Sequence, residues 1–128
     1  SGALIWVEGE RKTSALFIAL LQKLLQIYLR APVIHVILDN YRIHDSKIVH
    51  AALRGFGGRI QLHFLPPYCP DDNRIERAWE DLHANVTRNH TCPSMTLLMR
   101  EVRYYLRKRN RKVTKRRQAT IPGKRAAA

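Results

Sequence analysis

Two acidic residues, Asp39 and Glu76, stand at positions where their side chains could share a metal ion. Asp39 follows the apolar run of residues 33–38, and Glu76 falls in the first turn of a predicted helix after a proline-rich loop, with 36 residues between the two acids. Two carboxylates without a cysteine ligand offer the hard oxygen atoms that Mg²⁺ or Mn²⁺ prefers. A pair of such ions activates a water and stabilises the leaving oxygen in phosphodiester cleavage. The two acids therefore predict a metal-dependent site that cuts nucleic acid.

Each acid also has a purely structural explanation. An Asp-Asn pair such as Asp39-Asn40 often forms the turn after a strand. Glu76 can complement the dipole at a helix N-terminus, which contributes roughly 0.3–1 kcal/mol. The catalytic explanation gains from the shared position of the two acids, because ligands of open α/β sheets bind beyond the carboxyl ends of the strands. Both explanations remain open on the residues alone.

The hydrophobic pattern predicts a βαβ unit that carries both acids to one edge of a sheet. Residues 33–38 are apolar except for His35, as expected of a strand covered on both faces. Residues 59–64 alternate between apolar and polar side chains, and the helix between the two strands can be capped by Asp45 or Ser46. A short crossover of this kind joins parallel strands, so the fold class is α/β.

Further elements flank this unit. Residues 4–7 are predicted to form a short strand, and residues 13–29 an amphipathic helix with Thr13 or Ser14 as its cap. A final helix begins at Pro93. Between them, the helix that carries Glu76 has one apolar face, formed by Ile75, Ala78, Trp79, Leu82 and Val86.

Basic residues are concentrated at the end of the chain. The formal net charge is +13, and residues 107–128 contain 10 of the 23 basic residues and none of the 10 acidic ones. We therefore expect one domain, residues 1–106, followed by a basic, disordered tail, residues 107–128. The tail can neutralise DNA phosphates or be a simple solvated end. The predicted DNA contacts are Arg107, Lys108, Arg109, Arg111, Lys112, Lys115, Arg116 and Arg117.

Cysteine content and hydropathy restrict the class of protein. The chain has two cysteines, Cys69 and Cys92, with no paired spacing, which fits a reducing cytosol better than a disulfide scaffold. The longest apolar-rich stretch, residues 15–29, is interrupted by Gln22 and Lys23, so no membrane span is expected.

Two motifs resemble those of a known family. The first is Leu38-Asp39-Asn40-x-x-Ile43-His44, and the second is Leu65-Pro66-Pro67-Tyr68-x-Pro70-x-x-Asn73-x-Ile75-Glu76-Arg77-x-Trp79. Together they resemble the DDE transposases of the mariner-like superfamily, and the bacterial insertion-sequence branch is the most similar. The resemblance covers roughly residues 2–108.

The resemblance implies a ribonuclease-H-like fold, two Mg²⁺ or Mn²⁺ ions, DNA hydrolysis at transposon ends and attack of the freed 3′-hydroxyl on target DNA. Asp39 would be the second catalytic acid and Glu76 the third, and both would bind metal. The supporting residues would be Asn40 and His44 in the metal-binding loop, and Tyr68 and Asn73 on the approach to Glu76. Trp79 would anchor its helix in the core. The implied location is the bacterial cytoplasm, at the nucleoid when DNA is bound.

The chain also departs from the family pattern. Cys69 replaces the usual Ser, Arg74 the usual Pro, and Tyr41-Arg42 a small residue and a proline. No Asp precedes Asp39, although the family's first acid lies on an earlier strand. We therefore expect the C-terminal part of a transposase catalytic domain that lacks the first two strands and is inactive alone. A second copy or an N-terminal part would complete it; the alternative is a non-catalytic nucleic-acid-binding remnant or an assembly piece.

Overall fold

The computed structural model describes residues 2–67 and 73–120, except for the side chain of Thr120. The chain divides into two compact units. The first, which we call the sheet unit, is Ile5–Glu76; the second, the helical unit, combines Ser1–Leu4 with Arg77–Ala128. Each unit is described separately.

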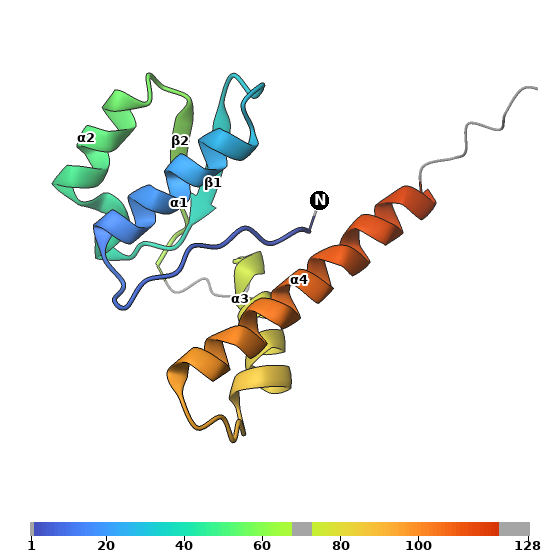
Figure 1. Cartoon of the computed structure of the whole chain (residues 1–128). Helices are drawn as coiled ribbons and strands as arrows, with labels where there is room; N and C mark the ends of the chain where they lie inside the picture. Colours follow the sequence, from blue (N-terminus) through green and yellow to red (C-terminus); the bar gives the residue numbers. More distant parts are fainter. Residues whose placement is uncertain (1, 68–72, 121–128) are drawn as a thin grey trace, which may run out of the picture. The chain divides into compact units, whose positions relative to one another are not determined.

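The sheet unit contains a parallel βαβ motif, as predicted from the sequence. Strand β1 (Ile34–Leu38) pairs with strand β2 (Ile60–Phe64) in a register that runs from Ile34 opposite Ile60 to Leu38 opposite Phe64. Helix α2 (Lys47–Gly55) connects the two strands (Figure 1). The expected α/β class is therefore present as a two-stranded sheet with helices in the described residues.

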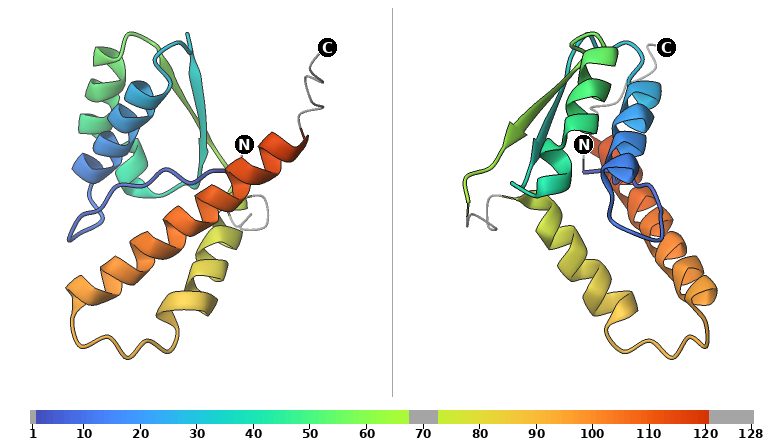
Figure 2. Two further views of the ribbon diagram at one scale, coloured as in Figure 1. Left: turned by 45° about the vertical axis from the view of Figure 1, so that its right-hand side comes forward. Right: turned by 90° about the vertical axis from the view of Figure 1, so that its left-hand side faces the viewer.

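One face of this sheet forms the core. Helices α1 (Ser14–Ile27) and α2 lie on the same side of the strands in both views of Figure 2. On the other face Ile37 is 66% exposed, so the expectation of a strand covered on both faces is wrong for the sheet unit. The physical reason is that α1 and α2 both pack on one side. The buried cluster there consists of Phe17, Leu21, Leu38, Val49 and Ile60.

The helices of the sheet unit begin after predicted cap residues, but only Thr13 makes a capping hydrogen bond. The Thr13 hydroxyl oxygen accepts a hydrogen bond from Leu16 N, which confirms Thr13 as the N-cap of α1. Ser46 occupies the N-cap of α2 but makes no capping bond; its hydroxyl donates to Ser14 Oγ at 2.7 Å. At the other end of α1, the Arg59 guanidinium donates to three backbone carbonyls in the segment of residues 28–31.

The predicted strand at residues 4–7 is absent. The backbone of Leu4 is instead occupied by the side-chain amide of Asn110, which accepts from Leu4 N and donates to Leu4 O, both at 2.8 Å. An amide side chain thus supplies the donor and acceptor that a neighbouring strand would provide. Residues 4–7 therefore do not belong to a sheet.

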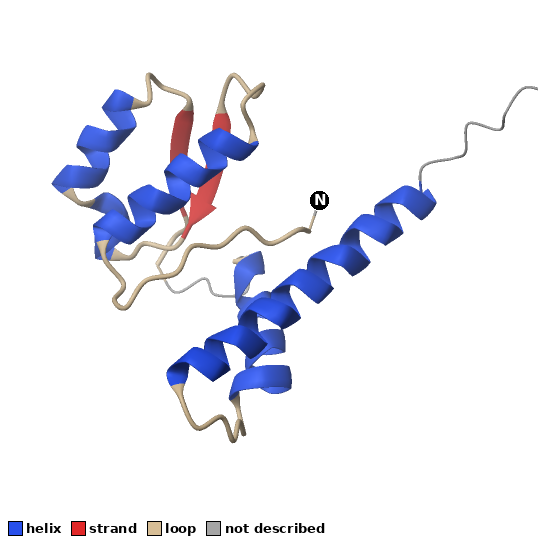
Figure 3. Ribbon diagram, in the orientation of Figure 1, coloured by secondary structure: helices blue, strands red, loops and turns tan. Residues whose placement is uncertain are grey.

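The helical unit is built from the end of α3 (Arg74–Leu82), a π-helical turn η3 (His83–Thr87) and the long helix α4 (Met95–Thr120), shown in Figure 3. Its buried side chains are Ala78 and Leu82 of α3, with Leu98 and Leu106 of α4. No helix in the described part of the chain is long and apolar enough to cross a membrane.

Two expectations fail in the helical unit. Helix α4 continues to Thr120, so a disordered tail from Arg107 is wrong for residues 107–120. Lys and Arg are good helix formers, and neither Gly nor Pro interrupts the segment before Pro122. Trp79 is 51% exposed and does not anchor α3, because the buried stripe follows Ala78 and Leu82 on a neighbouring face.

Candidate active site

Asp39 occupies the position where a parallel sheet presents its ligand-binding edge. It follows Leu38, the buried last residue of β1, whose carbonyl accepts a hydrogen bond from Leu65 N at 2.8 Å. That bond continues the β1–β2 pairing one residue past the end of β2. Strand pairing thus holds the backbone next to Asp39. The Asp39 side chain is 57% exposed, so its carboxylate is accessible to solvent.

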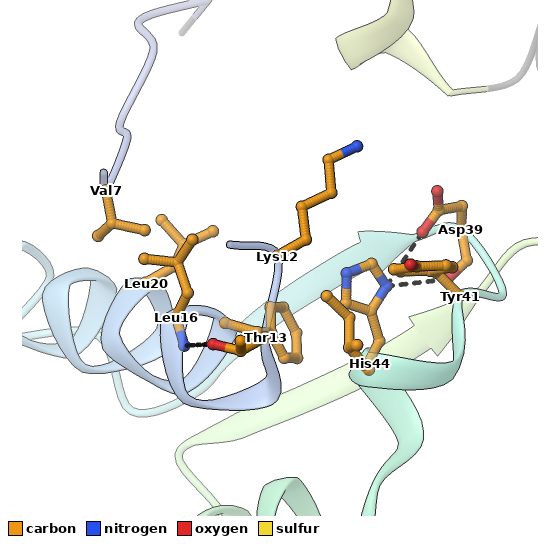
Figure 4. A pocket seen from close by; sticks show the side chains of 10 residues that line it. Val7, Lys12, Thr13, Leu16, Leu20, Asp39, Tyr41 and His44 are labelled. Carbon is orange, nitrogen blue, oxygen red and sulfur yellow. Dashed lines mark hydrogen bonds and ion pairs between the residues drawn. The ribbon is translucent and has the colours of Figure 1, made fainter. Parts of the chain in front are cut away.

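His44 holds the Asp39 carboxylate. It lies in η1 (Arg42–Asp45), a single 3₁₀ turn, and its Nδ1 is 3.0 Å from Asp39 Oδ1 and 3.3 Å from the Asp39 backbone carbonyl (Figure 4). Both oxygens can only accept, so Nδ1 must carry the proton and donate. The contact uses Oδ1 and leaves Oδ2 without a hydrogen-bond partner among the described residues.

The imidazole of His44 is itself fixed by packing. Its ring centroid is 4.5 Å from that of Phe17 and 5.9 Å from that of Tyr41, and its side chain is only 18% exposed. A hydrogen bond also joins α1 to η1, because the Ser14 hydroxyl donates to the carbonyl of Ile43 at 3.0 Å. Helix α1 therefore positions η1, and η1 positions Asp39.

A cavity of about 430 Å³ opens beside this acid. Figure 4 shows Asp39, Tyr41 and His44 on one side of it, and Lys12, from the segment before α1, also lines it. The remaining lining is mostly apolar and includes Leu16 and Leu20 of α1. The cavity thus combines one carboxylate and one ammonium group on an apolar wall, all within the sheet unit.

Glu76 stands in the first turn of α3, as predicted. Its backbone N donates to the Asn73 carbonyl at 3.0 Å, so Asn73 marks the start of the helix. Glu76 and Asn73 are partly buried, Asn40 is exposed, and Tyr68 lies outside the described residues. The described residues include no cluster of three or more side chains that could together hold a metal ion.

The donor chemistry of the two acids fits a hard divalent cation. Both are carboxylates, and Asp39 keeps Oδ2 outside its contact with His44. Mg²⁺ is typically held by one or two carboxylates and several waters. Asp39 and Glu76 can therefore contribute to such a site, which further ligands would have to complete.

The predicted DNA-binding residues all lie on α4, and Arg109 is engaged within the helical unit. Arg109 donates to the Gly2 carbonyl at 3.1 Å and approaches Asp81 to 3.9 Å, and its side chain is 32% exposed. The other predicted contacts, Arg107, Lys108, Arg111, Lys112, Lys115, Arg116 and Arg117, are exposed side chains on the same helix.

A second cavity, which sequence reasoning missed, lies in the helical unit. It has a volume of about 440 Å³ and is lined by Asp81, Asn85, Tyr104, Tyr105, Lys108, Arg109 and Lys112. We call it the polar cavity. The signal that could have revealed it is the spacing of its α4 residues at i, i+1, i+4, i+5 and i+8, which places them on one helix face.

Asp81 organises the wall of the polar cavity. It accepts a hydrogen bond from the Tyr105 hydroxyl at 2.5 Å and one from Asn85 Nδ2 at 3.1 Å. The hydrogen bond to Asp81, with smaller contributions from burial and from the charge of Asp81, raises the pKa of Tyr105 above its ordinary value of 10.0. Tyr105 therefore stays a neutral donor at physiological pH.

Comparisons with known proteins agree on one family. A family model described as DDE superfamily endonuclease matches residues 2–98. A Shigella sonnei protein, the insertion element IS630 uncharacterized 39 kDa protein, is 41% identical over 106 residues, which are 83% of this chain and 31% of that protein. The chain thus spans about a third of the curated relative that it matches. No solved structure matches.

Proposed function

The chain belongs to the DDE superfamily of endonucleases, in the branch of bacterial insertion elements, and from this premise we propose that it is the C-terminal part of a transposase catalytic domain. Its reaction is metal-dependent cleavage of DNA at transposon ends, followed by strand transfer into target DNA. The proposed setting is the bacterial cytoplasm, with the protein at the nucleoid when DNA is bound.

The observation that carries the proposal is the fixed carboxylate of Asp39. It stands at the carboxyl end of β1, inside the segment matched by the family, and is oriented by the 3.0 Å contact with His44. Residues that hydrogen-bond to a metal ligand orient that ligand, and their loss lowers the affinity of the site for the metal. A structural turn former would need no such support.

In this proposal Asp39 and Glu76 hold Mg²⁺ or Mn²⁺. Bound there, such an ion would supply Lewis-acid stabilisation of charge on the phosphodiester. His44 keeps the Asp39 carboxylate oriented, Asn40 completes the loop, and Asn73 shapes the approach to Glu76. Tyr68, a further predicted supporting residue, lies outside the described residues. Lys12, which lines the same cavity as Asp39, can attract a DNA phosphate.

Two carboxylates leave the coordination of the ions incomplete. We place the missing acid on polypeptide beyond these 128 residues, in an N-terminal part of the transposase or in a second copy of a homodimer. The relative's greater length supports the first source, since this chain spans 31% of it. The chain alone is therefore expected to be inactive.

The test is a nicking assay with Mn²⁺ and supercoiled DNA that carries the element's ends. It compares the chain alone with the chain fused behind the remaining sequence of the insertion-element relative. The fusion should cleave, and either Asp39→Ala or Glu76→Ala should abolish cleavage. Asp45→Ala is the matched control, because Asp45 is a nearby exposed acid that also pairs with a histidine, His50. Cleavage that survives either active-site change would refute the assignment.

The exposed cations of α4 support a DNA-binding role that does not depend on catalysis. Residues 107–117 carry eight Lys and Arg side chains on a helix, and seven of them are exposed. Contacts of this kind neutralise phosphates and position a protein without reading base sequence. The alternative function is that of a non-catalytic DNA-binding piece. In that case the fusion would bind DNA without cleaving it, and Asp39→Ala and Glu76→Ala would leave the binding unchanged.

A further inference from the structure

We propose that the polar cavity of the helical unit binds an unpaired nucleotide of DNA, with a base against Tyr104 and a phosphate at Lys108 and Lys112. This inference rests on the proposed function in one respect, namely that DNA is the partner. It goes beyond that function because it assigns a separate binding site, distinct from the acids Asp39 and Glu76, and a state of DNA in which a base has left the duplex.

The cavity has the size of a ligand site and is formed within one unit. Its volume of about 440 Å³ falls inside the range of roughly 300–1,000 Å³ typical of small-molecule pockets. Side chains of Asp81 and Asn85 form one wall and side chains of α4 the other. Figure 2 shows these segments, α3 with η3 and then α4, as consecutive parts of a helical hairpin.

The charges of the cavity favour an anion. Three cations, Lys108, Arg109 and Lys112, line it together with one carboxylate, Asp81. That carboxylate is occupied by the Tyr105 hydroxyl and lies 3.9 Å from Arg109. Lys108 and Lys112 are exposed, and the described residues include no ion pair to either of them. Two ammonium groups are therefore left to receive a phosphate.

Tyr104 adds a surface for a base. Its side chain is 62% exposed, and the Lys108 ammonium lies 6.0 Å from its ring centroid. A flat aromatic ring beside a cation matches a nucleotide, which joins a flat base to a phosphate. Aromatic rings that stack on bases, next to a groove of positive charge, are the usual means of binding single strands.

The aromatic ring selects unpaired DNA. In a duplex both faces of each base are stacked on neighbouring bases, so a protein ring reaches a base face only after the nucleotide has left the stack. Asn85 can also contact the edge of such a base. Its Nδ2 donates to Asp81 O at 2.7 Å and to Asp81 Oδ1 at 3.1 Å, so its Oδ1 remains as an acceptor.

The first experiment measures binding of the 128-residue chain to an oligothymidylate and to a duplex of equal length by fluorescence anisotropy. Tyr104→Ala should weaken binding of the single strand by about 5- to 150-fold, the range for loss of one base–aromatic stack. Duplex binding should change by less than about twofold, and Tyr104→Phe, which keeps the ring, should bind both as the wild type does. Equal losses on both DNAs, or no loss on the single strand, would overturn the inference.

The second experiment compares two lysines of α4. Lys108 lines the polar cavity and Lys115 does not, although both are exposed. Lys115→Gln should weaken single strand and duplex to a similar degree, whereas Lys108→Gln should weaken the single strand more than the duplex. Equal effects of the two changes on both DNAs would reject the cavity and leave the general DNA-binding role intact. If the chain binds neither the single strand nor the duplex, both the nucleotide site in the polar cavity and the DNA-binding role of α4 are refuted.

Discussion

Replacing His44 with Phe separates the orientation of Asp39 from the packing of the site. Phenylalanine retains an aromatic ring against Phe17, which now lies 4.5 Å from the imidazole centroid, and removes the donor that lies 3.0 Å from Asp39 Oδ1. Asp39 keeps its charge and its place after β1. We therefore expect the sheet unit to remain folded while the carboxylate becomes free to rotate.

The expected loss is about tenfold in Mn²⁺ affinity. A hydrogen bond to a charged group contributes about 1.5–3 kcal/mol net. His44 is 18% exposed but Asp39 is 57% exposed, so water competes for the carboxylate and the lower end of the range applies. About 1.5 kcal/mol corresponds to roughly a tenfold change in Kd. This agrees with the roughly 10- to 100-fold effect of changing residues that support metal ligands.

The assay is a Mn²⁺ titration followed by paramagnetic broadening of backbone amide signals around Asp39. His50→Phe is the matched control, because His50 makes a similar contact of 2.7 Å to Asp45 and both of those side chains are more than half exposed. The control should bind Mn²⁺ as tightly as the wild type. If His44→Phe also retains full affinity, or if His50→Phe loses as much, His44 does not orient a metal ligand.

Two further predictions concern stability. Leu21 is fully buried, so Leu21→Ala should lower the free energy of unfolding of the sheet unit by about 2.7–5 kcal/mol. Leu29 is 73% exposed, so Leu29→Ala should lower it by less than about 0.5 kcal/mol. Urea titration followed by NMR signals of β1 and β2 measures both changes, and equal losses would contradict the packing of α1. The pKa of Tyr105 is raised in the folded chain, so its contribution to stability is complete below pH 10.0 and is lost as the pH rises through the folded value. Tyr105→Phe should remove that loss in urea titrations from about pH 9 to about pH 11, and an unchanged pH dependence would show that the contact with Asp81 does not form.

The sequence predicted those parts of the fold in which local pattern and packing agree. The parallel strands, the Thr13 cap and the position of Glu76 in the first turn of α3 all follow from hydrophobic periodicity and capping chemistry. The resemblance implied a supporting role for His44 beside Asp39, and the structure shows a 3.0 Å contact between their side chains. The role of Phe17 in holding His44 could not be predicted, because it depends on where α1 packs.

Other predictions failed because distant residues decided the outcome. Residues 4–7 have the composition of a strand, but Asn110, 106 positions away from Leu4, satisfies the Leu4 backbone. High charge suggested a disordered end, whereas helix propensity and the absence of Gly or Pro let α4 continue to Thr120. Trp79 has a large apolar side chain, yet the face of α3 that is buried belongs to Ala78 and Leu82.

The helical state of residues 107–120 changes how α4 can meet a polyanion. A disordered tail loses backbone entropy worth roughly 1–2 kcal/mol per residue when it becomes ordered on a partner. The cations of α4 lie on a backbone that is already helical before a partner binds. The backbone entropy is therefore lost when the chain folds and does not weaken binding. Its charges also keep fixed spacings of about 1.5 Å per residue along the helix axis. A helix breaker placed at Thr114 would therefore weaken association without removing a single charge.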